Sequence, residues 1–170
     1  MIELTTPISE EAAAGLRVGD TVAISGHILC GRDAVLPKVL KLIEEGRADE
    51  LGVDLHGQVV FHTAVSVAGV GPTSSNKLEI ESSIAPLSAA GVKLHLGKGA
   101  LHRETVEALA RHNAVYAVIP PVTALLGAKT TEQRVLAFPE LGMEALYLIK
   151  VDRYPAIIAA AQGGSIYDER

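Results

Sequence analysis

Runs of β-branched and aliphatic residues alternate along this chain with segments whose apolar residues recur at helical spacing. The first kind covers residues 21–25, 58–63, 92–96 and 114–119, and the second covers residues 34–45, 77–87 and 103–112. β-branched runs between turn residues are typical of strands, and helical spacing is typical of amphipathic helices. No repeat, low-complexity tract or linker interrupts the alternation. It predicts a single domain over residues 1–170, of the α/β or α+β class with a mixed sheet and helices, and we take α/β as the expected class.

Turn and cap residues refine this prediction. Ser9 is placed to cap a short helix over residues 10–16, and the strand that ends at Gly26 can resume over residues 28–30 beyond a bulge. A weakly patterned apolar run over residues 64–70 leads into a loop. The remaining apolar segments predict a short helix over residues 122–126 and strands over 135–138, 145–151 and 156–161.

Composition limits the partners that we expect. Aromatic residues make up 4% of the chain and tryptophan is absent, so the core must consist mainly of Val, Leu, Ile and Ala. The net charge is −5 and there is no Lys/Arg-rich run, so we do not expect nucleic acid as a partner. No apolar stretch is long enough for a membrane span, and the N-terminus lacks a basic region followed by an apolar one. We therefore expect a cytoplasmic protein that does not enter the membrane.

Cys30 is the single cysteine of the chain. It cannot form an internal disulfide, and an iron-sulfur or zinc site needs several ligands. We therefore expect no metal ligands in this chain, and any metal chemistry would come from another polypeptide.

Three loops that follow predicted strands carry polar or cationic side chains between small residues. Arg32 follows Gly31, Thr73 and Ser74 follow a Gly-Pro pair with Lys77 beyond them, and Lys98 lies between two glycines. Loops at strand ends are where α/β domains collect binding groups, so these side chains could converge on one ligand. The alternative, equally open at this point, is that they are helix caps, a local ion pair and a solvated turn residue.

If the loops converge, three positive charges meet at Arg32, Lys77 and Lys98. Such a cluster suits a dicarboxylate, which carries two negative charges. The hydroxyl of Thr73 is a weak base at its ordinary pKa, so acid-base work by it would need neighbouring cations to stabilise the alkoxide. Lys98 and Arg32 are the candidates for that stabilisation.

Five ordered sequence blocks resemble the β subunit, or C-terminal domain, of class I fumarases and L-tartrate dehydratases. The blocks are LTTPIS with VGDTVAISG, then GRDA, GPTSS, LGKG and ELGMEA, and the likeness spans nearly the whole chain. The resemblance implies a swivelling β/β/α fold. It also implies a hydro-lyase that adds water reversibly to the double bond of a C4 dicarboxylate, with fumarate and malate as the leading pair and L-tartrate to oxaloacetate as the next.

The same resemblance implies roles for the loop residues and a partner. Thr73 would remove the proton next to a carboxylate, while Arg32, Lys77 and Lys98, with Ser74 beside the base, would bind substrate. A cluster-bearing α subunit would hold a [4Fe-4S] cluster whose open iron acts on the substrate hydroxyl. The chain would be active only with that subunit, in a homodimer or an αβ hetero-oligomer.

Two departures from the family pattern keep a second function open. Lys77 stands where the family has an arginine, and it lacks the bidentate fork with which arginine grips a carboxylate. Leu36 stands where the family usually has a histidine. A non-catalytic anion-binding or regulatory module on the same scaffold is therefore the alternative. We expect His27 and His62, near these loops, to be structural.

Overall fold

The computed structural model describes residues 1–66, 69–73, 77–119 and 129–168, with the backbone alone described over 64–66, 69–73 and 77–80. Its helical segments are α1 (Glu10–Ala14), α2 (Leu36–Glu44), η1 (Ala48–Leu51), α3 (Lys77–Ala89), α4 (Arg103–Arg111) and η2 (Pro139–Glu144). Its strands are β1 (Ile2–Thr5), β2 (Thr21–Cys30), β3 (Val59–Phe61), β4 (Thr63–Ser66), β5 (Gly69–Thr73), β6 (Leu94–Gly97), β7 (Val115–Val118), β8 (Thr130–Ala137), β9 (Leu146–Ala161) and β10 (Gly164–Ser165).

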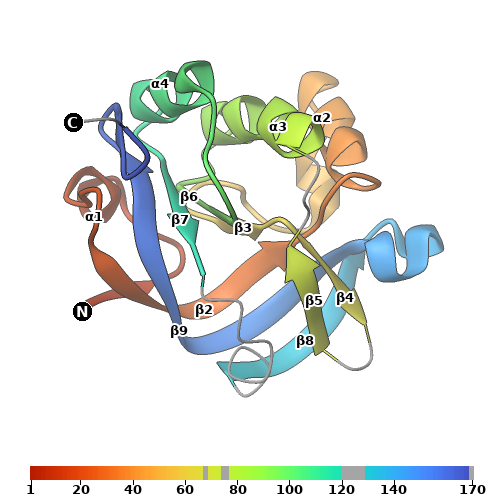
Figure 1. Ribbon diagram of the computed structural model, residues 1–170. Helices are drawn as coiled ribbons and strands as arrows, with labels where there is room; N and C mark the ends of the chain where they lie inside the picture. The colour runs from red at the N-terminus through yellow and green to blue at the C-terminus, as the bar shows by residue number, and fades with distance from the viewer. Residues whose placement is uncertain (67–68, 74–76, 120–128, 169–170) are drawn as a thin grey trace.

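One mixed sheet of eight strands forms the body of the described chain. Strands β1, β2, β3, β6 and β7 run parallel in that order. The long strand β9 is antiparallel and pairs with both β7 and β2, so the pairings of β2, β3, β6, β7 and β9 close into a ring. Figure 1 shows β9 curving along the lower side of the sheet, between β2 and β8, with α2, α3 and α4 side by side above the strands. The α/β class with a mixed sheet is thus confirmed.

Aliphatic side chains fill the interior of this ring. The largest cluster draws on α1 and on strands β2, β3, β6, β7 and β9, and its two large aromatic rings, Phe61 and Tyr154, meet edge to face at 6.2 Å. A second cluster packs α2 and η1 against the outer face of the sheet, and a third packs α4 against β7 and β9. Two layers of helix and sheet therefore share a core that needs little aromatic surface.

The observed elements confirm some predicted boundaries and correct others. Ser9 Oγ accepts a hydrogen bond from the backbone N–H of Ala12 at 3.1 Å, as expected of a helix cap. The predicted bulge lies between Ile24 and Gly26, where the register of β2 against β9 shifts. The two strands predicted after residue 145 are one strand, β9, because Pro155 pairs with Ala23 without breaking the ladder. The predicted helix over 122–126 lies outside the described residues.

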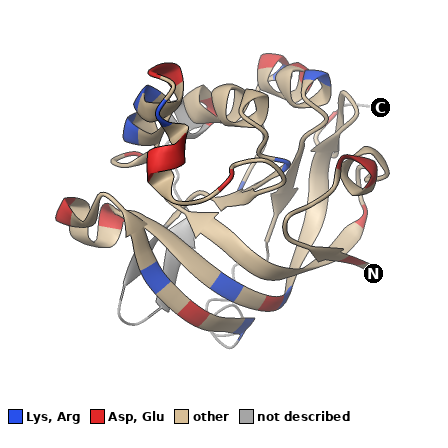
Figure 2. Cartoon of the chain, turned by 180° about the vertical axis from the view of Figure 1, so that it is seen from behind, with Lys and Arg blue, Asp and Glu red and all other residues tan. Residues whose placement is uncertain are grey.

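Charges of both signs alternate on the exposed ribbon of β8 and β9, as Figure 2 shows from behind. Glu132 lies opposite Lys150 in the register of the two strands. Opposite charges facing each other across an antiparallel pair favour that pairing.

None of the helices in the described part of the chain is long and apolar enough to cross a membrane.

Candidate functional site

The site begins with the way three neighbouring parallel strands end. Cys30 of β2 pairs with Phe61 of β3, and Phe61 pairs with Leu96 of β6, so the carboxyl ends of these strands lie in one row. The chain segments that follow them therefore leave the sheet at the same edge, where ligands commonly bind in α/β proteins. We call this edge the carboxyl edge. Arg32, the β4–β5 hairpin and Lys98 all emerge there.

Arg32 is placed by a close approach between the end of β2 and helix α2. The N–H of Gly31 donates to the carbonyl of Phe61 at 3.0 Å, and the Arg32 carbonyl accepts from the N–H of Leu36 at 3.0 Å. A Cβ atom on Gly31 would lie 2.7 Å from Cγ1 of Val35, so a larger residue would push the first turn of α2 away. Gly31 thus allows the short connection that fixes the backbone of Arg32.

The side chain of Arg32 is held by Glu144. Nε of Arg32 lies 2.9 Å from Oε1 and 3.1 Å from Oε2 of Glu144, and Nη2 lies 2.5 Å from Oε1. Each of the two side chains is 30% exposed. The hydrogen bonds to Glu144 raise the pKa of Arg32, which therefore stays charged.

Glu144 reaches Arg32 because of the shape of η2. Phe138, just before η2, has φ 56°, and Gly142 within it has φ 60° and ψ −124°, so the segment turns sharply at both places. Phe138 and Leu141 pack against the second core cluster, which includes Leu36. This packing anchors the segment beside the start of α2. Glu144 was not among the site residues expected from sequence, although it lies in the ELGMEA block.

Thr73 lies at the base of the β4–β5 hairpin. In the register of the hairpin, Thr73 pairs with Thr63, which lies two residues after the end of β3 at Phe61. The pairing returns the chain to the carboxyl edge, and α3 begins four residues later at Lys77. The backbone of Thr73 is thus carried to the edge where Arg32 emerges. Ser74 lies outside the described residues.

Lys98 occupies a tight turn that follows β6. The hydroxyl of Tyr116 donates to the carbonyl of Gly99 at 3.1 Å, and burial raises the pKa of that hydroxyl, so it keeps its proton. A Cβ atom on Gly97 would lie 3.1 Å from the Tyr116 hydroxyl oxygen, which leaves little room for a side chain there. Lys98 itself is exposed. The buried tyrosine therefore fixes the turn that presents an exposed lysine at the edge.

A chain of buried polar side chains lies directly behind these loops. Nε2 of His62 is 3.2 Å from Nδ1 of His95, and Nε2 of His95 is 2.9 Å from the hydroxyl oxygen of Ser88. Both rings are essentially inaccessible, at 1% and 0% exposure, and Nδ1 of His62 has no partner in the described structure. Burial lowers the pKa of His62 to about 4 and that of His95 well below its usual value. Both imidazoles are therefore neutral near pH 7.

Metal-ligating groups are sparse in the part of the chain that the structure describes. Cys30 is fully buried, and burial raises the pKa of its thiol, which disfavours the thiolate that a metal requires. No group of three or more His, Cys, Asp or Glu side chains suited to a metal ion occurs among the described residues. These residues do not fit an iron-sulfur cluster.

A surface hollow of about 590 Å³ lies away from the carboxyl edge. It is lined by residues of η1 and by the segment that follows it, including the acidic Asp49 and Asp54, and by Ala90 at the end of α3. Two carboxylates without a lining lysine or arginine do not suit an anionic ligand. The charge at the carboxyl edge, rather than the size of a hollow, identifies the candidate site.

Comparison with known proteins identifies the family of this chain. Residues 1–170 match the family described as Fumarase C-terminus. The chain belongs to this family. It is 30% identical over 169 residues to the L(+)-tartrate dehydratase subunit beta of Escherichia coli K12, with 92% of this chain and 81% of that protein covered.

Two longer proteins are also similar to this member of the Fumarase C-terminus family. A putative class I fumarate hydratase of Geobacillus stearothermophilus is 28% identical over 183 residues, which cover 99% of this chain and 34% of that protein. The anaerobic class I fumarate hydratase of Escherichia coli K12 is 26% identical over 173 residues, covering 96% and 31%. The chain thus corresponds to about a third of each of these hydratases and to most of a protein named as a subunit.

Proposed function

We propose that this chain is the β subunit of a two-subunit hydro-lyase that hydrates and dehydrates a C4 dicarboxylate. Fumarate and malate are the leading substrate pair, and L-tartrate to oxaloacetate is the next. Family membership and the names of the relatives support a hydro-lyase subunit. The observation that carries the proposal is the in-register ending of β2, β3 and β6, because it brings the segments of Arg32, Thr73 and Lys98 to one edge.

The charge at this edge suits the proposed substrate. Arg32 keeps its charge through its bonds to Glu144, and Lys98 stands exposed on a turn held by Tyr116. In the proposed complex Arg32 and Lys98 bind substrate carboxylates, and Lys77 adds a third positive charge at the start of α3. Ser74 would add a hydroxyl beside the base. Charge-assisted hydrogen bonds of this kind are stronger than neutral ones and therefore suit a doubly charged ligand.

Thr73 is the proposed base for dehydration. Its oxygen takes the proton from the carbon next to a carboxylate, the electron pair of that C–H bond forms the double bond, and the hydroxyl leaves the neighbouring carbon. An alkoxide on Thr73 needs positive charge nearby, and Lys98 and Arg32 are the cations that emerge at the same edge. In the hydration direction Thr73 returns the proton to carbon.

The [4Fe-4S] cluster of the proposed enzyme belongs to the α subunit. The single buried cysteine, and the lack of a group of three metal-ligating side chains among the described residues, support an α subunit as the proposed host of the cluster. The cluster would supply the Lewis acid for the substrate hydroxyl. The β subunit would bind and orient the carboxylates and hold or release the proton.

Anaerobic co-expression with a cluster-bearing α subunit tests the proposal. The purified complex should interconvert fumarate and malate or convert L-tartrate to oxaloacetate. The absorbance of the fumarate double bond measures the first reaction. Turnover of at least one of these substrates is the expected result. A stable complex with an intact cluster that turns over none of the three would contradict the proposal. It would favour the alternative, a non-catalytic anion-binding module. The buried, apolar Leu36 at the start of α2, where the family usually has a histidine, supports that alternative.

A further inference from the structure

Glu144 is an acidic residue beside Arg32 at the edge where Lys98 also emerges, and Asp33, which directly follows Arg32 in the chain, is a second one. A carboxylate there repels a dicarboxylate substrate, so its presence needs a reason. Within the described part of the chain Glu144 accepts three hydrogen bonds, all from Arg32, and its two oxygens take up Nε and one side of Nη2. An arginine has five N–H donors in a rigid planar fork. The contacts with Glu144 therefore occupy one edge of the guanidinium and leave the Nη1–Nη2 edge to donate.

Both partners of this pair are fixed at their backbones. Arg32 is tied to the start of α2 through its carbonyl, and Glu144 ends a 3-10 segment that is anchored in the core by Phe138 and Leu141. A pair between two flexible surface side chains would contribute little, because ordering both chains costs entropy. Here the two anchors reduce the number of orientations open to the guanidinium.

We propose that Glu144 is a positioning residue for Arg32 in the hydro-lyase reaction. Glu144 holds the guanidinium by Nε and Nη2 so that the Nη1–Nη2 edge meets a substrate carboxylate in two parallel hydrogen bonds. Glu144 touches neither the substrate nor the proton that is transferred, and acts through Arg32. This inference rests on the function proposed above and deepens it. It also explains why an acidic residue belongs in a site for an anion.

The turnover test is a double-mutant cycle in the complex with the α subunit. Glu144→Gln should lower kcat/KM for the dicarboxylate about tenfold or more when Arg32 is present, because a bidentate contact loses its alignment. In an Arg32→Gln background the same change should lower it less than about twofold, since residues that act as a unit are not additive. Equal losses in both backgrounds would overturn the proposal.

Glu140 supplies the matched control. It lies in the same 3-10 segment as Glu144 but is exposed, and no hydrogen bond or ion pair of its side chain is found in the described structure. Glu140→Gln removes the same charge from the same element and should leave kcat/KM within about twofold of wild type. A tenfold loss in this variant would assign the effect to the segment, or to its charge, rather than to the contact with Arg32.

A second measurement on the isolated chain decides the positioning role without turnover. In ¹⁵N–¹H correlation spectra, the Nε–H of Arg32 should exchange slowly with water in wild type and Glu140→Gln, and at least tenfold faster in Glu144→Gln. Unchanged exchange in Glu144→Gln would show that another contact holds the guanidinium and would overturn the inference. If the wild-type complex turns over no dicarboxylate while the exchange result holds, the proposed function fails and the Arg32–Glu144 contact stands on its own.

Discussion

His62 and His95 stack in the interior with ring centroids 5.4 Å apart, and Nε2 of one lies 3.2 Å from Nδ1 of the other. One nitrogen of this contact must carry the hydrogen, so the tautomers of the two rings are linked. If His95 donates to His62, then Ser88 donates to His95, and Nδ1 of His62 carries a hydrogen without a described acceptor. If His62 donates, its Nδ1 is an acceptor without a described donor. Both arrangements are those of two neutral rings, which burial favours.

The buried histidine pair should make stability depend on pH. The pKa of His62 is about 4 in the folded chain against an ordinary value of 6.5, because burial disfavours the cation. Between these values the unfolded chain binds more protons, so the free energy of unfolding falls as the pH drops from 6.5 towards 4. We expect a loss of about 2 kcal/mol from His62 between pH 7 and pH 5. Urea unfolding at the two pH values measures it.

Two variants separate this effect from general acid sensitivity. His62→Gln keeps a group able to hydrogen-bond His95 but cannot titrate, so the loss of stability between pH 7 and pH 5 should shrink. His27→Gln removes an exposed histidine instead and should leave that loss in place. An unchanged pH dependence in His62→Gln would show that the buried pair is not its source.

Removing the hydroxyl of Tyr116 should loosen the turn that carries Lys98. Tyr116→Phe deletes the hydrogen bond to the carbonyl of Gly99 while the ring still packs against Gly97. We expect a loss of about 1 kcal/mol in stability, typical of one hydrogen bond, and a rise of KM larger than the change in kcat. Tyr154→Phe is the control for the loss of a buried tyrosine hydroxyl, since that hydroxyl contacts Thr130 rather than the turn of Lys98. Equal effects on KM in both variants would contradict the role given to the turn.

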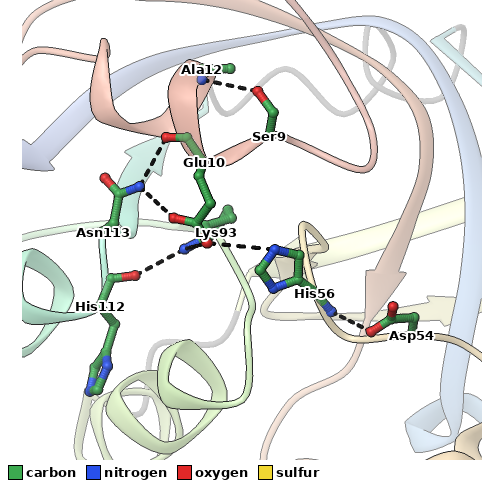
Figure 3. A network of polar contacts seen from close by, with 8 residues as sticks. All are labelled: Ser9, Glu10, Ala12, Asp54, His56, Lys93, His112 and Asn113. Carbon is green, nitrogen blue, oxygen red and sulfur yellow. Dashed lines mark hydrogen bonds and ion pairs between the residues drawn. The ribbon is translucent and has the colours of Figure 1, made fainter.

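Removing either partner of the Glu10–Lys93 ion pair should lower stability, but by different amounts. Figure 3 shows Lys93 between the carboxylate of Glu10 and the carbonyl of His112, at 2.7 and 3.1 Å. The side chain of Lys93 is 4% exposed and that of Glu10 is 53% exposed. Glu10→Gln leaves a buried ammonium without a counter-charge, whereas Lys93→Met leaves a carboxylate that water can solvate. Glu10→Gln should therefore lower the urea midpoint more than Lys93→Met does.

Glu11 gives the control for that comparison. It is the next residue of α1, it is exposed, and no ion pair of its side chain is found in the described structure. Glu11→Gln should leave the urea midpoint unchanged. If Lys93→Met proves the more damaging change, the buried charge is not what Glu10 stabilises.

Lys77 offers a test of substrate binding at the start of α3. Lys77→Met should raise KM for the dicarboxylate about tenfold or more, because a hydrogen bond to a charged group contributes about 1.5–3 kcal/mol. Lys77→Arg should keep KM at or below the wild-type value, since the arginine fork can grip a carboxylate with two bonds. Steady-state kinetics of the αβ complex measure both. A KM unchanged in Lys77→Met would remove this residue from the binding site.

The fold was predictable where local pattern and tertiary pairing agree. The cap at Ser9 and the bulge after Ile24 follow from residues whose local chemistry decides the structure. The continuity of β9 was not predictable, because Arg153 has φ 52° and Pro155 looks like a strand end, yet pairing with β2 carries the strand through. The β4–β5 hairpin was not predicted either, since the apolar run over residues 64–70 lacks a period-two pattern and was expected only to lead into a loop.

The loops of the candidate site could be predicted from the sequence, but the residues that contact those loops from elsewhere in the fold could not. Arg32 and Lys98 follow β2 and β6, which end in one row with β3, whereas Thr73, expected in a loop, is the last residue of β5. Glu144 could not be paired with Arg32 from pattern, because 112 residues separate them and the contact depends on the turn of η2. The link from His62 to His95 was missed for the same reason. It depends on β3 and β6 being neighbours, which spacing along the chain does not reveal.

The most direct measurement is kcat of the αβ complex with Thr73 replaced. Thr73→Ala should lower kcat about 100-fold or more, because a positioned acid-base group typically contributes 10²–10⁴-fold, with the complex and its cluster intact. Thr131→Ala, on the exposed ribbon of β8, should stay within about twofold of wild type. A Thr73→Ala complex that retains wild-type kcat would contradict the claim that the carboxyl edge holds the base of a hydro-lyase.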